Sequence, residues 1–422
     1  MTKYNVIDLF AGCGGLSDGF KKTGMYNLLA AVEWEKAPAT NLINRLETKW
    51  GIADARARVL VFDIQRTNEL FSGWSDDKIY GSNQGLDKLI GDKKVDLIIG
   101  GPPCQAYSLA GRIRDENGMK DDYRNYLFES FIKVVKKYRP KAFVFENVQG
   151  MLSAKPGGIP VTKLIRKEFE EAGYIIVNDL KEHALIDFTE FGIPQKRNRV
   201  IILALRKSLF KYPEKVLFDF YHRVLPMYKE DKKSTVKDAI GDLPPLLPVD
   251  EEYKQNGRKY SHTPCEFKIP NHEPRYHSQR DIGIFKLLTE DIEQRTFNYI
   301  STEALKRLYT EKTGKTSNVH KYYVLRWNEQ SNTIPAHLYK DGLRHIHPDS
   351  RQARSITVRE AARLQTFDDD YEFISSTSDN YKMIGNAVPP KFSEKLALAI
   401  YKVLANGYDE YLLEVGKTYS EK

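Results

Sequence analysis

The chain has 422 residues, and 65 Lys and Arg against 57 Asp and Glu give it a net charge of +8 and an isoelectric point near 9.0. This length predicts two domains, and the positive charge fits a polyanionic partner. The three cysteines show no pairing pattern or metal spacing, which argues against a disulfide scaffold. No apolar run approaches the length of a membrane span and no signal peptide opens the chain, so we expect a cytoplasmic protein.

The first predicted element is a strand, loop and helix at the N-terminus. Residues 6–10 form a short apolar run that breaks into a glycine-rich loop, and a helical pattern opens at Leu16. The backbone N–H groups of such a loop can face a ligand. The next apolar run, 28–32, ends in Glu33, and an acid there can bind both hydroxyls of a ribose. The glycine spacing matches neither the dinucleotide nor the triphosphate motif, so it favours an adenosyl ligand; a simple chain reversal is the alternative.

A second predicted strand, residues 95–99, leads into a rigid turn that ends at Cys104. Glycines let the backbone of this turn approach a ligand closely, and prolines limit its flexing. In parallel α/β proteins the carboxyl ends of the strands carry the ligand site. Cys104 is therefore a candidate covalent nucleophile, and a buried structural cysteine is the alternative.

Six sequence blocks, in this order, resemble the motifs of the DNA cytosine-5 methyltransferases. They are DLFAGCGG at 8–15, PPCQ at 102–105, ENV at 146–148, QKRNR at 195–199, REAARLQ at 359–365 and GNAVPP at 385–390. The resemblance covers most of the chain except about 207–350. It implies an α/β, Rossmann-like class I S-adenosylmethionine-dependent methyltransferase sheet, with a smaller irregular target-recognition domain inserted before the C-terminal motifs.

The resemblance also assigns catalytic roles. Cys104 would attack C6 of cytosine, which turns C5 into a nucleophile. Glu146 would relieve the negative charge near N3, and a partly desolvated pocket would raise its pKa for that task. Arg197 would bind the cytosine O2. The other residues of the catalytic set are Pro103, Asn147 and Arg199.

The implied cofactor is S-adenosyl-L-methionine, which leaves as S-adenosyl-L-homocysteine. Glu33 would bind its ribose, Trp34 would lie against adenine, and Asp63 would reach the adenine amino group. For Trp34 and Asp63 the alternatives are a core aromatic and a strand-end cap. The remaining cofactor residues are Phe10, Gly12, Cys13, Gly14, Gly15, Ile64, Pro102, Asn386 and Ala387.

The polar stretch 105–125 has neither helical nor strand periodicity. A stretch of this length is usually functional or disordered. We expect a mobile lid that closes over DNA behind a flipped cytosine, and a disordered surface loop is the alternative. Its candidate DNA contacts are Gln105, Ser108, Arg112 and Arg114.

The pattern predicts a catalytic and cofactor domain at 1–206, a target-recognition domain at 207–353 and a return to the first domain at 354–422. Eight of the nine histidines lie in the middle segment. His345 and His347 lack partners with ligand spacing, so we expect no metal there; stacking, phosphate contact and plain packing are the alternatives.

The resemblance thus predicts a sequence-specific enzyme that methylates C5 of a flipped cytosine in double-stranded DNA. We expect a nucleoid-associated bacterial monomer, either an orphan methylase or the partner of a restriction endonuclease that acts on the same site without a stable complex. One alternative is an RNA cytosine-5 methyltransferase of the same fold, but the Cys-Phe-Thr element of that branch is absent. Another is an inactive DNA-binding regulator, which would be expected to lack Cys104, Glu146 or Arg197.

Overall fold

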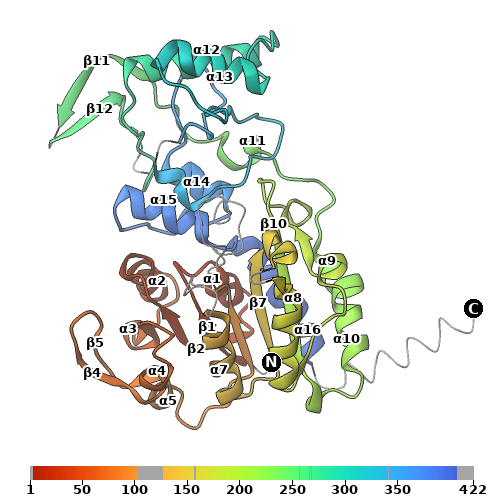
Figure 1. The fold of residues 1–422 in the computed structure, drawn as a ribbon. Coiled ribbons are helices and arrows are strands. Elements are labelled where there is room, and N and C mark those ends of the chain that lie inside the picture. Colours follow the sequence, from red (N-terminus) through yellow and green to blue (C-terminus); the bar gives the residue numbers. More distant parts are fainter. Residues whose placement is uncertain are drawn as a thin grey trace, which may run out of the picture. The chain divides into compact units, whose positions relative to one another are not determined.

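The computed structural model describes residues 3–102, 127–155, 158–255, 257–265, 267, 269–340 and 342–405 (Figure 1). The chain divides into two compact units. Unit 1 consists of Met1–Gly192, Arg197–Asp231 and Ala387–Lys422, and unit 2 consists of Ile193–Lys196 and Lys232–Asn386. No helix within the described ranges is long and apolar enough to cross a membrane.

Unit 1 is built on an eight-stranded sheet in the order β3-β2-β1-β6-β7-β10-β8, with β9 paired to β10. The strands are β1 (Tyr4–Leu9), β2 (Tyr26–Glu33), β3 (Val59–Val61), β6 (Leu97–Gly100), β7 (Ala142–Val148), β8 (Tyr174–Ile175), β9 (Leu185–Asp187) and β10 (Asn198–Arg206). The pairs that join β3, β2, β1, β6 and β7 are parallel, whereas β10 runs antiparallel to β7. The carboxyl ends of the five parallel strands therefore meet at one edge of the sheet.

Helices cover this sheet because its central strands are apolar on both faces. In Figure 1, α7 and α8 lie in front of the sheet and α16 lies behind it. The helix α16 packs closely on α1, where the Cβ of an alanine at Gly19 would stand 2.5 Å from the carbonyl oxygen of Pro390. The helices of unit 1 are α1 (Gly15–Lys22), α2 (Lys36–Thr48), α3 (Ala55–Arg58), α4 (Thr67–Ser72), α5 (Gly85–Ile90), α7 (Leu127–Tyr138), α8 (Val161–Glu171), α9 (Leu180–His183), α10 (Pro213–Asp219) and α16 (Pro390–Leu404).

A small hairpin, β4 (Trp74–Asp77) with β5 (Gly81–Asn83), stands outside the main sheet. The ring of Trp74 stacks on Phe62 with 3.8 Å between centroids. The Arg66 guanidinium lies 4.7 Å from the centroid of the Phe62 ring and is paired with Asp77 in the hairpin. These contacts fix the hairpin to the segment that follows β3.

The boundaries of the two units differ from those expected from the sequence. Residues 207–231 belong to unit 1, because α10 packs on β10 and the following helical turn η6 (Phe220–Val224) packs on α16. Residues 354–386 belong to unit 2, because α14 (Val358–Leu364) packs on α11 (Val236–Ile240) and α15 (Thr377–Asn386).

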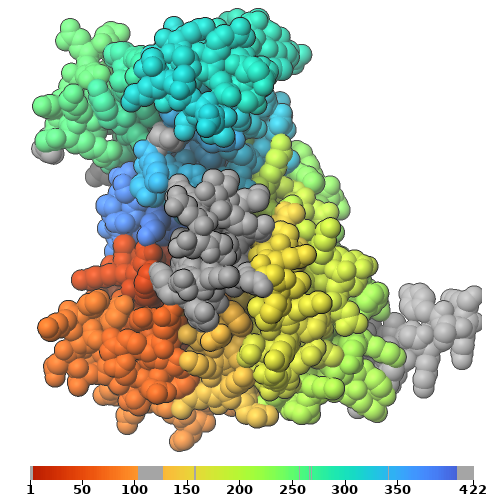
Figure 2. Space-filling view, viewed as in Figure 1, coloured from red at the N-terminus to blue at the C-terminus, as the bar shows by residue number. Residues whose placement is uncertain are grey.

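Unit 2 contains more regular structure than its sequence pattern indicates. Besides α11, α14 and α15, it has a hairpin and two longer helices, which are β11 (Pro248–Gln255), β12 (Arg258–His262), α12 (Gln279–Glu293) and α13 (Thr302–Thr313). Phe285 and Leu288 of α12 and Leu308 of α13 share one apolar cluster. In the space-filling view, the residues of α12 and α13 form one continuous surface (Figure 2).

A buried ion pair forms the polar centre of unit 2. The guanidinium of Arg354 donates to both carboxylate oxygens of Glu360 at 2.6 and 2.7 Å, and both side chains are fully buried. The same carboxylate caps α14 by accepting the backbone N–H of Thr357. His345 and His347 are each only 2% exposed, so both are packed inside unit 2. Within the described residues, no group of three or more His, Cys, Asp or Glu side chains could hold a metal ion.

We predict that acid weakens unit 2 before unit 1. Burial lowers the pKa of His262 to about 4 and the pKa values of His277, His345 and His347 to about 3. Below about pH 6.5 these histidines are protonated in the unfolded chain but stay neutral in folded unit 2. The free energy of unfolding of unit 2 therefore falls as pH falls from 7 to 5. In unit 1, burial raises the pKa of Asp8 to about 7, so this group acts in the opposite direction.

Hydrogen exchange followed peptide by peptide at pH 7 and pH 5, corrected for intrinsic exchange, measures this difference. Protection of α12 and α14 should fall at pH 5, while protection of β1 and β6 should hold. Replacing Asp8 with Asn should remove the stabilisation that unit 1 gains as pH falls, and it should leave unit 2 unchanged. Equal loss of protection in both units would contradict the prediction.

Candidate active site

The carboxylate of Glu146 lies at the carboxyl edge of the sheet, near the end of β7. Its Oε1 is 3.1 Å from Nε of Arg199, which enters from the antiparallel strand β10. The two side chains are 13% and 14% exposed. Burial raises the pKa of Glu146, and the charges of Arg199 and Arg197 oppose that rise. The strand pair thus holds an acid that takes up a proton more readily than an exposed glutamate.

Arg197 is the most deeply buried member of this group, at 1% exposure. Its Nη2 donates to the carbonyl oxygen of Ala387 at 2.9 Å. Burial is the largest effect on the pKa of both Arg197 and Arg199 and lowers it, while the nearby Glu146 charge raises it. Two guanidinium groups thus share one carboxylate, which leaves a net positive charge that suits a ligand atom gaining negative charge.

The end of β6 touches this carboxylate directly. A Cβ placed on Gly101 would stand 2.6 Å from Oε2 of Glu146, much closer than real Cβ contacts. Only glycine lets the backbone before Pro102 pass so close to the acid. Pro102, which follows it, is buried. The turn that leads to the cysteine motif therefore lies against Glu146.

Asn147 points into the protein and is 4% exposed. Its Oδ1 accepts the backbone N–H of Val148 at 2.8 Å, so the side chain fixes the end of β7. This contact gives Asn147 a role in positioning the backbone at the end of β7.

The glycine-rich loop after β1 adopts the backbone that its sequence requires. Gly12 and Gly14 have φ values of +56° and +85°, and Gly14 caps the N-terminus of α1. Phe10 also has a positive φ, +57°, which is uncommon outside glycine. Cys13 lies in the same loop and is buried.

Glu33 ties this loop to the end of β2. Its Oε2 accepts the N–H of Gly12 at 2.8 Å, and its Oε1 accepts the N–H of Glu35 at 2.8 Å. The side chain is largely buried, and burial raises its pKa while the two backbone hydrogen bonds lower it. A carboxylate oxygen can accept more than one hydrogen bond, so capacity remains for hydroxyl donors.

The neighbouring cofactor candidates differ in exposure. Trp34 is 49% exposed, so the structure does not make it a core aromatic. Asp63 is half-buried, and its Oδ1 accepts the N–H of Gln65 at 2.9 Å. This bond is the strand-end cap weighed for Asp63, and it occupies one of the two carboxylate oxygens. Ile64 is 4% exposed beside it.

The chain returns to the loop through the last motif. A Cβ on Gly15 would overlap the carbonyl oxygen of Val388 and stand 3.2 Å from the Cβ of Ala387. Ala387, which also accepts the Arg197 hydrogen bond, thus joins the glycine loop to the arginine of the catalytic set. Asn386 is exposed at the end of α15 and belongs to unit 2.

Six of the sequence-predicted site residues lie outside the residues that the structure describes. They are Pro103, Cys104, Gln105, Ser108, Arg112 and Arg114.

Sequence reasoning missed two buried carboxylates around α1. Asp8 accepts a hydrogen bond from the hydroxyl of Ser17 in the first turn of the helix. Asp18 pairs with Arg45 at 2.8 Å and accepts the indole N–H of Trp50 at 2.8 Å. Asp8 opens the first motif block, and an acid inside an apolar strand run was the available signal.

Comparison with known proteins places this arrangement in a family. Residues 4–402 match the model of the C-5 cytosine-specific DNA methylases. The chain is 35% identical to the type II methyltransferase M.Bpa9945I of Bacillus paralicheniformis, over 96% of this chain and 99% of that protein. It is 31% identical to the type II methyltransferase M.DdeI of Desulfomicrobium norvegicum, over 93% and 87% of the two chains.

Solved structures agree on the fold. A DNA modification methyltransferase from an Escherichia coli prophage superposes with a TM-score of 0.58 at 24% identity, covering 95% of this chain and 99% of that one. The Dnmt2 methyltransferase of S. pombe superposes with a TM-score of 0.53 at 14% identity, covering 96% and 98%. These neighbours and the large central sheet confirm the class I methyltransferase fold. The chain belongs to the C-5 cytosine-specific DNA methylases and is a DNA cytosine-5 methyltransferase.

Proposed function

We propose that the protein methylates one cytosine within a specific double-stranded DNA sequence, after flipping that base out of the duplex. The stacked base is otherwise out of reach of the protein's side chains. The observation that carries the proposal is the buried group of Glu146, Arg197 and Arg199 against Gly101. Gly101 directly precedes the cysteine motif. The three charged side chains combine a proton donor with an excess of positive charge.

The thiolate of Cys104 adds to C6 of the flipped cytosine in this proposal, and electron density moves toward N3 and O2. Glu146 donates or shares a proton at N3, which its raised pKa favours. Arg197 donates to O2, Arg199 holds the Glu146 carboxylate, and Asn147 and Pro103 position the base. C5, now nucleophilic, would take the methyl group that the bound cofactor would supply. A base would then remove the C5 proton, and the Cys104 thiolate would leave to restore the aromatic ring.

The methyl donor is S-adenosyl-L-methionine, which supplies an electrophilic methyl group when it is bound. The glycine loop, Glu33 and Trp34 fit an adenosyl ligand. The buried carboxylate of Glu33 is hydrogen-bonded to the glycine loop, and the exposed indole of Trp34 follows it directly in the chain. Phe10, Cys13 and the loop glycines would hold its methionine end. Asp63, Ile64, Pro102, Asn386 and Ala387 would complete the site.

We place the protein in a bacterial restriction–modification system, because relatives that match nearly the whole chain are named type II methyltransferases. It would act on DNA in the cytoplasm as a monomer, and a restriction endonuclease would recognise the same sequence without forming a stable complex. Residues 207–353, mostly in unit 2, would carry sequence recognition. Residues 105–125, with Gln105, Ser108, Arg112 and Arg114, would close over the DNA.

Replacing Cys104 with Ser should abolish turnover while cofactor and DNA binding persist. A hydroxyl is a far weaker nucleophile at neutral pH, so we expect a loss of at least about a thousand-fold. Transfer of tritiated methyl groups to DNA measures turnover. DNA that carries 5-fluorocytosine at the target should trap the wild type and the Cys265→Ser control covalently, since fluorine cannot leave as a proton does. An adduct formed by Cys104→Ser would refute the assignment.

Replacing Gly101 with Ala should slow catalysis without unfolding the protein. The added methyl group would displace the Glu146 carboxylate, and loss of an acid–base group costs about 10²–10⁴-fold in rate. Single-turnover rates and thermal melting measure the two effects. Gly283→Ala is the matched control, because a Cβ there meets nothing within 4 Å. Equal single-turnover rates in both variants would count against the role of Glu146.

Alanine at Glu33 or Asp63 should weaken S-adenosylmethionine binding by about tenfold or more, because each change removes charge-assisted hydrogen bonds. Calorimetry measures the cofactor affinity, and DNA affinity at saturating cofactor should stay unchanged. Glu33→Gln keeps one acceptor oxygen and should fall between the wild type and Glu33→Ala. The assignment fails if both alanine variants bind the cofactor like the wild type.

A further inference from the structure

Gln195 opens the sequence block that carries Arg197 and Arg199, but it belongs to neither the catalytic nor the cofactor set. Its side chain is completely buried, at 0% exposure, and it lies in unit 2, whereas Arg197 lies in unit 1. Residues 195 and 197 are buried, while 196 and 198 are exposed. This alternation is typical of extended backbone, so the position of residue 195 bears directly on that of residue 197.

The carboxamide of Gln195 is hydrogen-bonded through both of its ends. Its Nε2 donates to the carbonyl oxygen of Leu364 at 3.0 Å and to Oε1 of Gln365, and its Oε1 accepts the backbone N–H of Ile334 at 3.1 Å. Leu364 is the last residue of α14, where the carbonyl groups have no partner within the helix. The amide thus satisfies a helix end and fixes residue 195 to two separate segments of unit 2.

The backbone around Gln195 is held as firmly as its side chain. Residue 195 forms a parallel β-bridge with Ser331. The N–H of Lys196 donates to the carbonyl oxygen of Ser331 at 2.8 Å, and the N–H of Ser331 donates to the carbonyl oxygen of Pro194 at 2.9 Å. These bonds lie on both sides of residue 195, so its position within unit 2 is fixed.

The segment that holds the Gln195 amide also packs against the chain that leads to Ala387. A Cβ on Gly385 would stand 2.3 Å from the carbonyl carbon of Pro335, so only glycine fits there. Two residues later, Ala387 accepts the hydrogen bond of the Arg197 guanidinium. The segment 334–335 therefore contacts the chain two residues before each partner of this hydrogen bond.

We propose that Gln195 is a positioning residue for methyl transfer, which acts by fixing the chain two residues before Arg197. The inference rests on the proposed role of Arg197, which is to donate to O2 of the flipped cytosine. Displacement of a catalytic group by about 1 Å can cost about 100-fold in rate. Loss of the amide would release the chain before Arg197, while the hydrogen bond to Ala387 would remain at the tip of the side chain.

Single-turnover methyl transfer at saturating DNA and cofactor tests the proposal in a double-mutant cycle. Gln195→Met keeps the length of the side chain and removes its hydrogen bonds, so the rate should fall by about 10–100-fold. In the Arg197→Ala background the same change should cost less than about twofold, because changes that act through one group are not additive. The affinity for S-adenosyl-L-methionine, measured by calorimetry, should stay unchanged in Gln195→Met.

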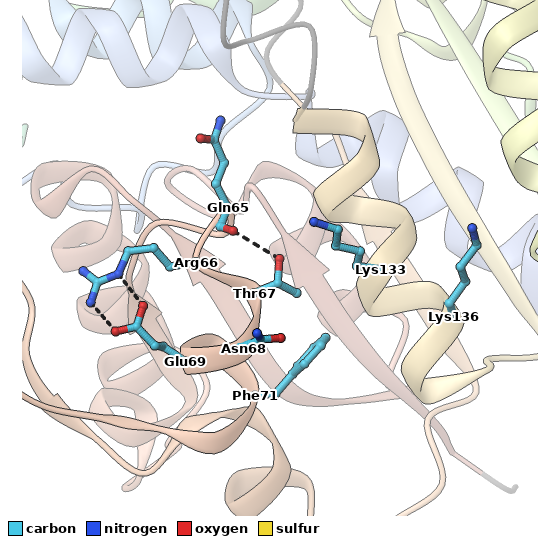
Figure 3. Close-up of a pocket in the computed structure, with 8 residues that line it drawn as sticks. All are labelled: Gln65, Arg66, Thr67, Asn68, Glu69, Phe71, Lys133 and Lys136. Atoms are coloured by element: carbon cyan, nitrogen blue, oxygen red, sulfur yellow. Dashed lines mark hydrogen bonds and ion pairs between the residues drawn. The ribbon is translucent and has the colours of Figure 1, made fainter.

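Two controls separate positioning from loss of stability. Asn380 is also a buried amide of unit 2, at 3% exposure, and it donates to two backbone carbonyl groups. Asn380→Leu should lower the melting temperature, as Gln195→Met does, but leave the single-turnover rate unchanged. Arg66 is a guanidinium of unit 1 that lines a cavity of about 460 Å³ beside α4 and donates twice to Glu69 at 2.6 Å (Figure 3). In the Arg66→Ala background, Gln195→Met should keep its full effect on the rate.

Three results would overturn the proposal: a wild-type rate in Gln195→Met, an undiminished loss in the Arg197→Ala background, or an equal loss of rate in Asn380→Leu. A wild-type rate in Arg197→Ala would refute the proposed role of Arg197 itself, and with it any action of Gln195 through that residue. Gln195→Glu keeps an acceptor oxygen for the N–H of Ile334. It takes the place of Gln195→Met in the same cycle, with the same expected results, if the methionine variant does not fold.

Discussion

The carboxyl edge of the sheet depends on how the charge of one buried carboxylate, Glu146, is compensated. Glu146 shares its pocket with Arg197 and Arg199, and each of these groups is costly to remove from water. Loss of one partner from such a group typically costs about 3–5 kcal/mol, because a charge stays buried alone. The antiparallel pairing of β7 with β10 keeps the Glu146 carboxylate and Arg199 together. Glu146 lies opposite Ile201, and Arg199 is two residues from Ile201 along β10, so both side chains point to the same face of the sheet. The sheet thus holds these two charged groups at a fixed separation.

Close backbone contacts extend this arrangement to the glycine loop after β1. Gly101 lets the end of β6 pass against Glu146, and Gly15 lets the chain at Val388 pass against the start of α1. Ala387 stands between the two, as the acceptor for Arg197 and a neighbour of Gly15. A side chain at either glycine would separate groups that the structure holds in direct contact. The positions of these groups therefore depend on the missing side chains of two glycines as much as on contacts.

The core of unit 2 combines a buried ion pair with a separate apolar cluster. Its polar centre, Arg354 with Glu360, orients α14, and its apolar cluster packs α12 on α13. His347 lies 3.5 Å from Glu360, and burial lowers the pKa of both His345 and His347 to about 3. A unit held by such a network keeps its helices in place without help from its exposed loops.

The sequence by itself determined the family, the sheet and the order of the site residues. Local patterns sufficed for β1, β2 and β6, because short apolar runs and glycine turns act within a few residues. It also indicated that Glu33 ends a strand, as it does in β2. Only the tertiary structure decided that Gly101 touches Glu146, that Ala387 joins Arg197 to Gly15, and that 354–386 belong to unit 2. These contacts join residues far apart in the chain, and no local preference encodes which distant backbone will fill the space left by a missing side chain.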